Sequence, residues 1–239
     1  MLPVYEILDA TWPAKSTLSA DGFTLRVGEG GIKRISCATL AGPLSAASID
    51  AAEAAQAQIG QQSLFMIRPD LSEEEGLLDA ELEQRGYQVI DPVTTYHAPV
   101  ASLTAEIPPI TAFAHWPPLQ ILRDLWAENA VVAARQAVME RACAPKAALL
   151  GRLQDRAAGG AFVAIHRETA MLHALCTAPH FQRQGLGRYL IHEAANWAAE
   201  NGARDFTLVV TRNNPANALY RALGMRRICD YHYRVKADT

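Results

Sequence analysis

Short apolar runs alternate with polar or glycine-containing turns in the second half of the chain. Residues 148–153, 161–166 and 171–177 form three such runs, and glycine or polar residues separate them. Runs of this length between such turns predict the strands of an antiparallel meander. Ahead of them, residues 119–129 and 131–143 carry apolar side chains at helical spacing, which predicts two helices.

The segment after the meander predicts a helix, a strand, a second helix and a last strand. The first helix ends at Gly202, since glycine tolerates the left-handed conformation that follows a helix C-terminus. Residues 206–211 predict the next strand. The Asn-Asn-Pro of residues 213–215 predicts the start of a helix running to Gly224, because an amide side chain can cap a helix and proline fits its first turn. Residues 227–235 alternate between apolar and polar positions, which predicts a last strand or hairpin.

The first half shows the same kinds of element less clearly. Residues 82–90 resemble residues 220–228, with Gly86 opposite Gly224, and this faint repeat links the two halves. The expected elements are a hairpin of residues 24–29 and 32–40 around Gly30-Gly31, a helix at 47–59, a strand at 63–68, a helix at 71–85 and a strand pair at 87–98.

Two Pro-Pro pairs in residues 105–118 predict a linker, since proline cannot continue a helix. The length of 239 residues allows two small domains. We therefore expect a mixed α/β protein with one domain at residues 1–104 and a second at residues 105–239.

Composition excludes several classes of function. Half of the residues are hydrophobic, which indicates a globular chain, and the net charge of -3 offers no basic excess to attract nucleic acid. The sequence lacks an apolar stretch of about 18 residues, so we expect no membrane span. The N-terminus does not resemble a signal peptide. Four scattered cysteines without metal-ligand spacing predict reduced thiols, no metal site and a cytoplasmic location. We expect a monomer or homodimer. The cysteines are Cys37, Cys143, Cys176 and Cys229.

The stretch APHFQRQGLGRYL, residues 178–190, carries two glycines and two arginines at the mouth of a predicted helix. Helix N-termini expose unpaired N–H groups and positive potential, and glycine lets an anion approach the backbone. The loop therefore predicts a phosphate site. It is not a P-loop, and Leu190 stands where the dinucleotide fingerprint needs its third glycine. A tight turn into a packed helix is the alternative for the loop taken alone.

Two strings at a fixed separation resemble the GNAT superfamily of acyl-CoA-dependent N-acetyltransferases. Residues 182–187 match the loop Q/R-x-x-G-x-G/A, and residues 213–225 match N-x-x-A-x-x-L-Y-x-x-x-G-F except at Met225. The resemblance covers about residues 105–239. It implies the acyl-CoA N-acyltransferase fold, with acetyl-CoA as co-substrate and an amine as acceptor. It also implies that the fourth strand of this fold splays from the fifth, so that the backbone of the fourth strand can pair with the pantetheine arm. The residues that it places at coenzyme A are Leu175, Cys176, Thr177, Gln182, Arg183, Gln184, Gly185, Leu186, Gly187, Arg188, Asn213 and Ala216.

Acyl transfer to an amine needs a neutral amine, a donor for the thioester oxygen and a proton for the departing thiolate. The resemblance implies that Tyr220 protonates the thiolate, whereas a packed aromatic is the plain alternative. The predicted fourth strand has no acid, so His173 is the candidate base, with a structural role as the alternative, and Glu168 is a weaker candidate. Strand alternation places His173 on the face of Leu175 and opposite Cys176, which is not taken as a nucleophile.

The first half lacks the glycine loop, and Leu82 stands where Tyr220 would be. We therefore expect residues 1–104 to be a degenerate copy of the second domain, with an unrelated α+β domain as the alternative. The chain as a whole predicts an N-acetyltransferase. A non-catalytic acyl-CoA sensor on the same fold is the rival function.

Overall fold

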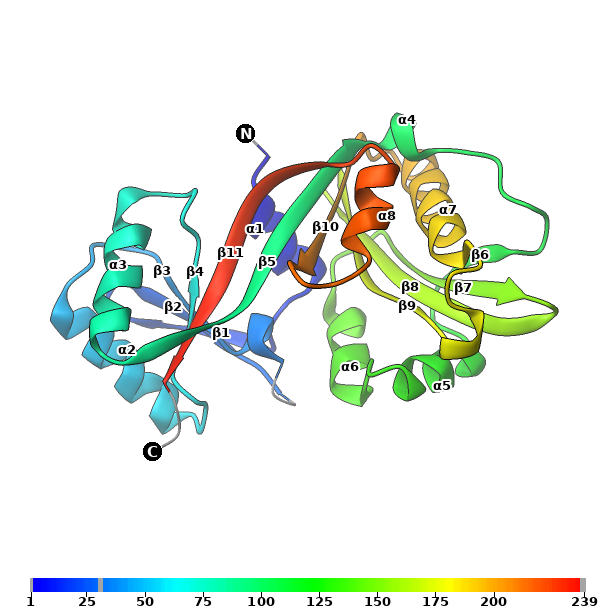
Figure 1. Ribbon diagram of the computed structural model, residues 1–239. Helices are drawn as coiled ribbons and strands as arrows, with labels where there is room; N and C mark the ends of the chain where they lie inside the picture. Colours follow the sequence, from blue (N-terminus) through cyan, green and yellow to red (C-terminus); the bar gives the residue numbers. More distant parts are fainter. Residues whose placement is uncertain (1, 30–31, 237–239) are drawn as a thin grey trace. The chain divides into compact units, whose positions relative to one another are not determined.

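The computed structural model describes residues 2–29 and 32–236, so the expected Gly30-Gly31 turn lies outside the described residues. The fold is mixed α/β, and the chain divides into two compact units (Figure 1). Unit 1 contains residues 1–13, 95–209 and 215–227. Unit 2 contains residues 14–94, 210–214 and 228–239.

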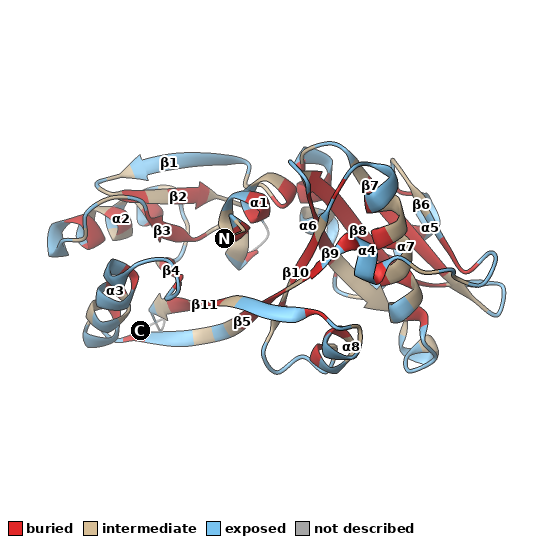
Figure 2. Ribbon diagram, turned by 90° about the horizontal axis from the view of Figure 1, so that it is seen from above, coloured by how far each residue is buried: buried red, intermediate tan, exposed pale blue. Residues whose placement is uncertain are grey.

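Unit 1 is built around an antiparallel meander. The edge strand β6 (Ala112–His115) pairs with β7 (Lys146–Leu153), which pairs with β8 (Arg156–His166) and then β9 (Thr169–Thr177). Next to β9 lies β10 (Asp205–Thr211), which runs parallel to it, and then β5 (Tyr87–Pro99), whose residues 95–99 belong to this unit. The central strand β8 is buried along almost its whole length (Figure 2).

Helices cover both faces of this meander. A Cβ on Gly160 would lie 2.3 Å from the Leu122 side chain of α5 (Gln120–Glu128), whereas one on Gly159 would lie 2.9 Å from Leu186 of α7 (Leu186–Glu200). Because adjacent residues of a strand point to opposite faces, α5 and α7 pack on opposite sides of β8, and each glycine allows that close approach. The remaining helices of the unit are α1 (Val4–Thr11), α4 (Val100–Leu103), α6 (Ala133–Arg141) and α8 (Asn217–Ala222).

Unit 2 repeats this connectivity with shorter strands. The strands β1 (Ser16–Ala20), β2 (Phe23–Val27) and β3 (Ala38–Leu40) are antiparallel, and β4 (Leu64–Ile67) follows parallel to β3 after α2 (Ala46–Gln58). Then come α3 (Glu73–Gln84) and the first part of β5, and β11 (Arg226–Lys236) pairs antiparallel with β4. Phe65 of β4 lies in the hydrophobic core of this unit. Its ring centroid is 5.5 Å from that of Phe23 and 5.6 Å from that of Tyr87.

The repeat seen in the sequence corresponds to this shared connectivity. Each unit has a run of antiparallel strands, four in unit 1 and three in unit 2, then a helix that leads to a parallel strand, and then a second helix and a last strand. All four helices end in the same way: the second residue beyond the helix is a glycine with positive φ. This conformation closes a helix at little steric cost only for glycine. The glycines are Gly60, Gly86, Gly202 and Gly224.

The structure differs from the expected elements in several places. The two units are discontinuous rather than divided at residue 104, because β5 and β11 each run from one unit into the other. The hairpin strand β1 and the helix α1 were not expected, although Asp21-Gly22 forms a tight turn typical of hairpins. Residues 87–98 form one strand rather than two. The last helix begins at Asn217 rather than near residue 213, because residues 212–216 form turns first.

None of the helices within residues 2–29 and 32–236 is long and apolar enough to cross a membrane. Over the same residues, His, Cys, Asp and Glu side chains do not gather in a group that could hold a metal ion.

Candidate functional site

The glycine loop ends at the start of α7 in a conformation that leaves helix amides unpaired. Gly185 precedes the helix in the left-handed conformation with φ 88°, and it makes no side-chain cap. The first helical bond is that of Arg188 N–H, which donates to Gly185 O at 3.0 Å. The amides of residues 185–187 therefore come before the helical bonds, where the positive end of the helix dipole lies. This arrangement is suited to an anion.

Side-chain amides brace the loop from within. Gln182 Nε2 donates to Thr177 O at 3.3 Å, and Gln184 Nε2 donates to His180 O at 3.0 Å. Both bonds tie the loop to the residues that connect it with β9. The Arg183 and Arg188 side chains are exposed, which lets their guanidinium groups reach a bound phosphate.

Strands β9 and β10 pair only over their first residues. The register joins Asp205 with Thr169 and ends where Leu208 meets Leu172, although β9 continues to Thr177 and β10 to Thr211. Beyond that point residues 175–177 are half-buried and lead directly into the glycine loop. Their backbone is not used by β10, so an extended amide-bearing chain can pair with it.

A bulge at Ala174 changes which side chains share a face of β9. Ala174 has φ 51°, and the register with β8 shifts there, so that Phe162 pairs with His173 but Gly160 pairs with Cys176. One extra residue therefore lies between them. Phe162 and Gly160 share a face of β8, which places His173 and Cys176 together on the α5 side. The sequence predicted Cys176 and His173 on opposite faces of the strand. That prediction was wrong, because the extra residue of a bulge interrupts the two-residue alternation.

His173 lies in a buried aromatic cluster. Its side chain is 5% exposed and stacks on Trp12, with ring centroids 4.8 Å apart. The fully buried Thr11 hydroxyl donates to Ile7 O at 2.8 Å, so its oxygen accepts the 2.9 Å hydrogen bond from His173 Nε2. These contacts fix the imidazole against α1.

Tyr220 lies in the second half of the short helix α8 with its ring buried, at 6% exposure. Within the described part of the chain, no group forms a hydrogen bond with its hydroxyl, and burial raises the pKa of Tyr220 to about 12. The phenol therefore keeps its proton at neutral pH. The neighbouring phenol of Tyr96, whose ring centroid lies 5.6 Å away, also contributes to the raised pKa. Tyr96 comes from β5, in the half of the sequence that was expected to hold no catalytic part, and no motif marks it.

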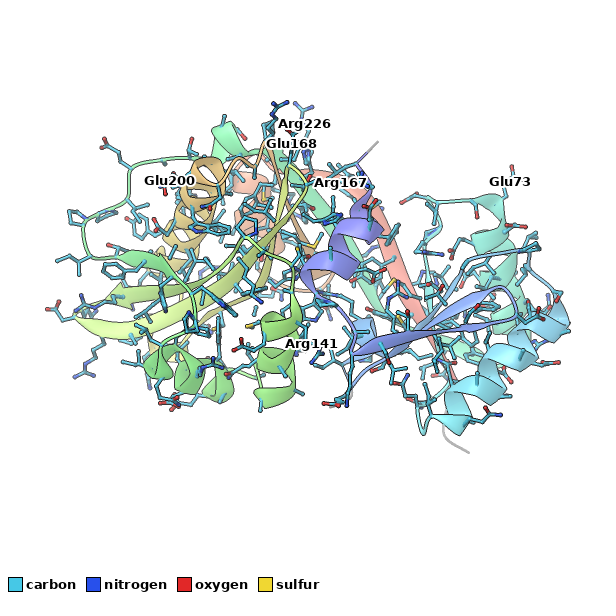
Figure 3. All side chains as sticks on the ribbon, turned by 180° about the vertical axis from the view of Figure 1, so that it is seen from behind. Glu73, Arg141, Arg167, Glu168, Glu200 and Arg226 are labelled. Atoms are coloured by element: carbon cyan, nitrogen blue, oxygen red, sulfur yellow. The ribbon has the colours of Figure 1, made fainter. Side chains whose placement is uncertain are left out.

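The other candidates are placed as follows. Burial raises the pKa of Cys176 to about 11, so this thiol stays protonated at neutral pH. Glu168 lies beside Arg167 in the turn before β9 (Figure 3) and pairs with Arg204 at 3.3 Å. Thr177 lies nine residues further along the chain, about 30 Å of strand, so Glu168 is remote from the loop. Asn213 is exposed in the turn after β10, and Ala216 is half-buried immediately before α8.

The comparisons with known proteins agree with this geometry. Residues 115–225 match the model of the acetyltransferase (GNAT) family, and this range contains both the glycine loop and Tyr220. This part of the chain therefore matches a GNAT acetyltransferase domain. No curated protein matches the sequence.

Solved structures share the fold over nearly the whole chain. A GCN5-related N-acetyltransferase from Kribbella flavida is 17% identical with a TM-score of 0.74, over 99% of this chain and 95% of that one. A functionally unknown conserved protein from Staphylococcus epidermidis ATCC 12228 is 11% identical with a TM-score of 0.70, over 97% of both chains. A tandem GNAT protein from the clavulanic acid biosynthesis pathway is 14% identical with a TM-score of 0.59, over 89% of this chain and 76% of that one. The fold is therefore that of the acyl-CoA N-acyltransferases, and the structures that share it include a tandem GNAT protein.

Proposed function

We propose that the protein moves an acetyl group from acetyl-CoA to a primary amine, with a single active site in unit 1. The observation that carries the proposal is the course of β9: it leaves β10 after Leu172 and runs into a glycine loop at the N-terminus of α7. An anion site thereby follows a stretch of β9 backbone that pairs with β8 but not with β10. In coenzyme A the amide-bearing pantetheine arm is joined to the pyrophosphate. The arm would match the strand backbone, and the pyrophosphate would match the anion site that follows it.

The residues of unit 1 fit that molecule. The amides of residues 185–187, with Arg183 and Arg188 beside them, would hold the pyrophosphate. The backbone of residues 175–177 would pair with the amides of the pantetheine arm, and an N–H of the bulged segment would donate to the thioester oxygen as it gains charge. Asn213 and Ala216 stay assigned to coenzyme A by the family pattern alone.

Tyr220 is assigned as the acid. The amine attacks the thioester carbon, the C–S bond breaks, and the Tyr220 hydroxyl gives its proton to the thiolate sulfur while the amine loses one proton. A phenol that stays protonated at neutral pH is suited to this step. His173 is not assigned as the base, because its bond to Thr11 and its stacking on Trp12 hold it in the core. Water takes the amine proton instead.

Unit 2 is proposed to be a degenerate copy without a coenzyme A site. Its helix α2 follows β3 as α7 follows β9, but Ser45 caps it: Ser48 N–H donates to Ser45 Oγ, and Ser45 N–H donates to Ser48 Oγ, both at 3.0 Å. This capping box uses helix-start donors that stay available at α7. An anion would have to displace it.

A buried arginine takes the place of the cofactor arm in unit 2. Arg68 follows β4 and donates from Nη2 to Leu40 O, at the end of the parallel neighbour β3. Its Nε donates to Glu75 Oε1 at 2.7 Å, and both side chains are almost completely buried. The Arg68 side chain thus occupies the carbonyl of Leu40, the strand-end group that would face pantetheine in an active copy.

The test is release of free thiol from acetyl-CoA in the presence of a panel of small amines, amino acids and peptides. The wild-type protein is expected to show amine-dependent turnover, and Tyr220→Phe to reduce it about a hundredfold with coenzyme A affinity unchanged. The matched control is Tyr87→Phe, which removes a buried phenol in unit 2 and leaves turnover unchanged. Binding of acetyl-CoA without turnover on any amine would favour the rival function, an acyl-CoA sensor.

A further inference from the structure

Tyr96 is held beside the Tyr220 ring by contacts at both ends. Its ring is 5% exposed and is tilted by 50° to that of Tyr220. Its backbone carbonyl accepts a 2.8 Å hydrogen bond from the hydroxyl of Thr207, a fully buried residue of β10. Its hydroxyl accepts a 3.4 Å hydrogen bond from Nη1 of Arg221, the residue that follows Tyr220. Strand and helix therefore fix the position of Tyr96 together.

We propose that Tyr96 is a positioning residue for the acid Tyr220, supplied to the active site by the N-terminal half of the sequence. This inference rests on the proposed acetyl transfer. When Tyr220 gives its proton to the thiolate, an S–H bond forms, an O–H bond breaks and a phenolate is left on Tyr220 in a buried place. Arg221 donates to the oxygen of Tyr96, which leaves the Tyr96 proton to donate toward that phenolate.

The phenolate explains why a second tyrosine matters here. An unpaired negative charge in a buried site is unfavourable. A hydrogen bond donated by a protonated Tyr96 lowers its free energy, whereas a second phenolate at Tyr96 would raise it, and that repulsion is the contribution of Tyr96 to the raised pKa of Tyr220. Arg221 orients that donor, since the guanidinium occupies one acceptor position of the Tyr96 oxygen and directs the Tyr96 proton away from itself. The ring of Tyr96 has a separate effect, because it limits the positions that the Tyr220 side chain can take. A Tyr96→Phe variant keeps the ring and removes only the hydroxyl.

The experiment is a double-mutant cycle on turnover of acetyl-CoA with the most active amine of the panel. Tyr96→Phe is expected to lower kcat about fivefold to tenfold, with KM for acetyl-CoA within twofold of wild type. In the Tyr220→Phe background the same change is expected to alter kcat by less than twofold, because the group on which Tyr96 acts is gone. Arg221→Met is expected to follow the same pattern with a smaller loss.

Each outcome decides one point. Equal fold-losses in both backgrounds would overturn the proposal, since a packing role lowers kcat whether or not Tyr220 carries a hydroxyl. An unchanged kcat in Tyr96→Phe would overturn it as well. An unchanged kcat in Tyr220→Phe alone would instead defeat the assignment of the acid, and an absence of turnover in wild type would defeat the proposed function. Thermal melts of all variants show whether each compares folded protein.

Discussion

Replacing Gly187 with glutamate puts a carboxylate at the mouth of helix α7. The backbone accepts a side chain there, because Gly187 does not have the positive φ found at Gly185. A Cβ at this position would lie 3.3 Å from Cδ2 of Leu219, so the tip of that side chain must move by a few tenths of an ångström. The variant is therefore expected to fold.

The size of the effect follows from the charge. A carboxylate about 6 Å from each of two phosphate charges repels each by about 0.7 kcal/mol in water, or about 1.4 kcal/mol together. That sum corresponds to a tenfold loss of affinity, and the side chain also displaces the anion from the helix amides. Coenzyme A affinity should therefore fall by at least about tenfold.

Calorimetric titration of coenzyme A measures this loss, with two matched controls. Gly187→Gln adds the same length without charge, and it should lose less affinity than Gly187→Glu. Ala199→Glu adds the same charge at an exposed position of the same helix, about 18 Å away and beyond the Debye length. It should bind as wild type. Undiminished affinity in a folded Gly187→Glu variant would refute the placement of the pyrophosphate.

Three further predictions concern stability. Tyr87→Phe removes the 2.8 Å hydrogen bond to Glu53, so urea denaturation should show a loss of about 1 kcal/mol while turnover stays unchanged; a fall in turnover would contradict a non-catalytic unit 2. Burial raises the pKa of Tyr220 to about 12 and that of Tyr233 well above its ordinary value. The unfolded chain loses these protons near pH 10 and the folded chain keeps them, so the free energy of unfolding should fall as pH rises from about 10 to 12, and equal values at pH 9 and pH 11 would count against this. A fragment of residues 105–239 lacks β5 and α1 and should not fold by circular dichroism; a cooperative melt of that fragment would show that neither element is needed.

The features that could be predicted from the sequence are those that depend on neighbouring residues. The glycine loop is local, because the residues that make the turn are also those proposed to bind the anion. The helix ends were equally readable, since Gly86, Gly202 and Gly224 each occupy the left-handed position that only glycine takes at little steric cost. The meander of β7 to β9 followed from the alternation of apolar runs and turns.

The features that escaped prediction depend on partners distant in sequence. The bulge at Ala174 is not marked by glycine or proline, and it exists because β9 accommodates one more residue than β8. It reversed the expected face of Cys176. Tyr96 lies 124 residues before Tyr220 in an ordinary strand, so only the pairing of β5 with β10 brings the two together. The division into discontinuous units has the same origin, because no local pattern tells which strands a long strand pairs with along its length.

The central claim is that one unit binds acetyl-CoA and the other does not. Calorimetric titration of acetyl-CoA into the full chain tests it most directly, because the stoichiometry counts the sites. The free amides at the start of α7 and the capped start of α2 predict one acetyl-CoA per chain. Two per chain would contradict the degenerate unit, and no binding at all would contradict the site itself.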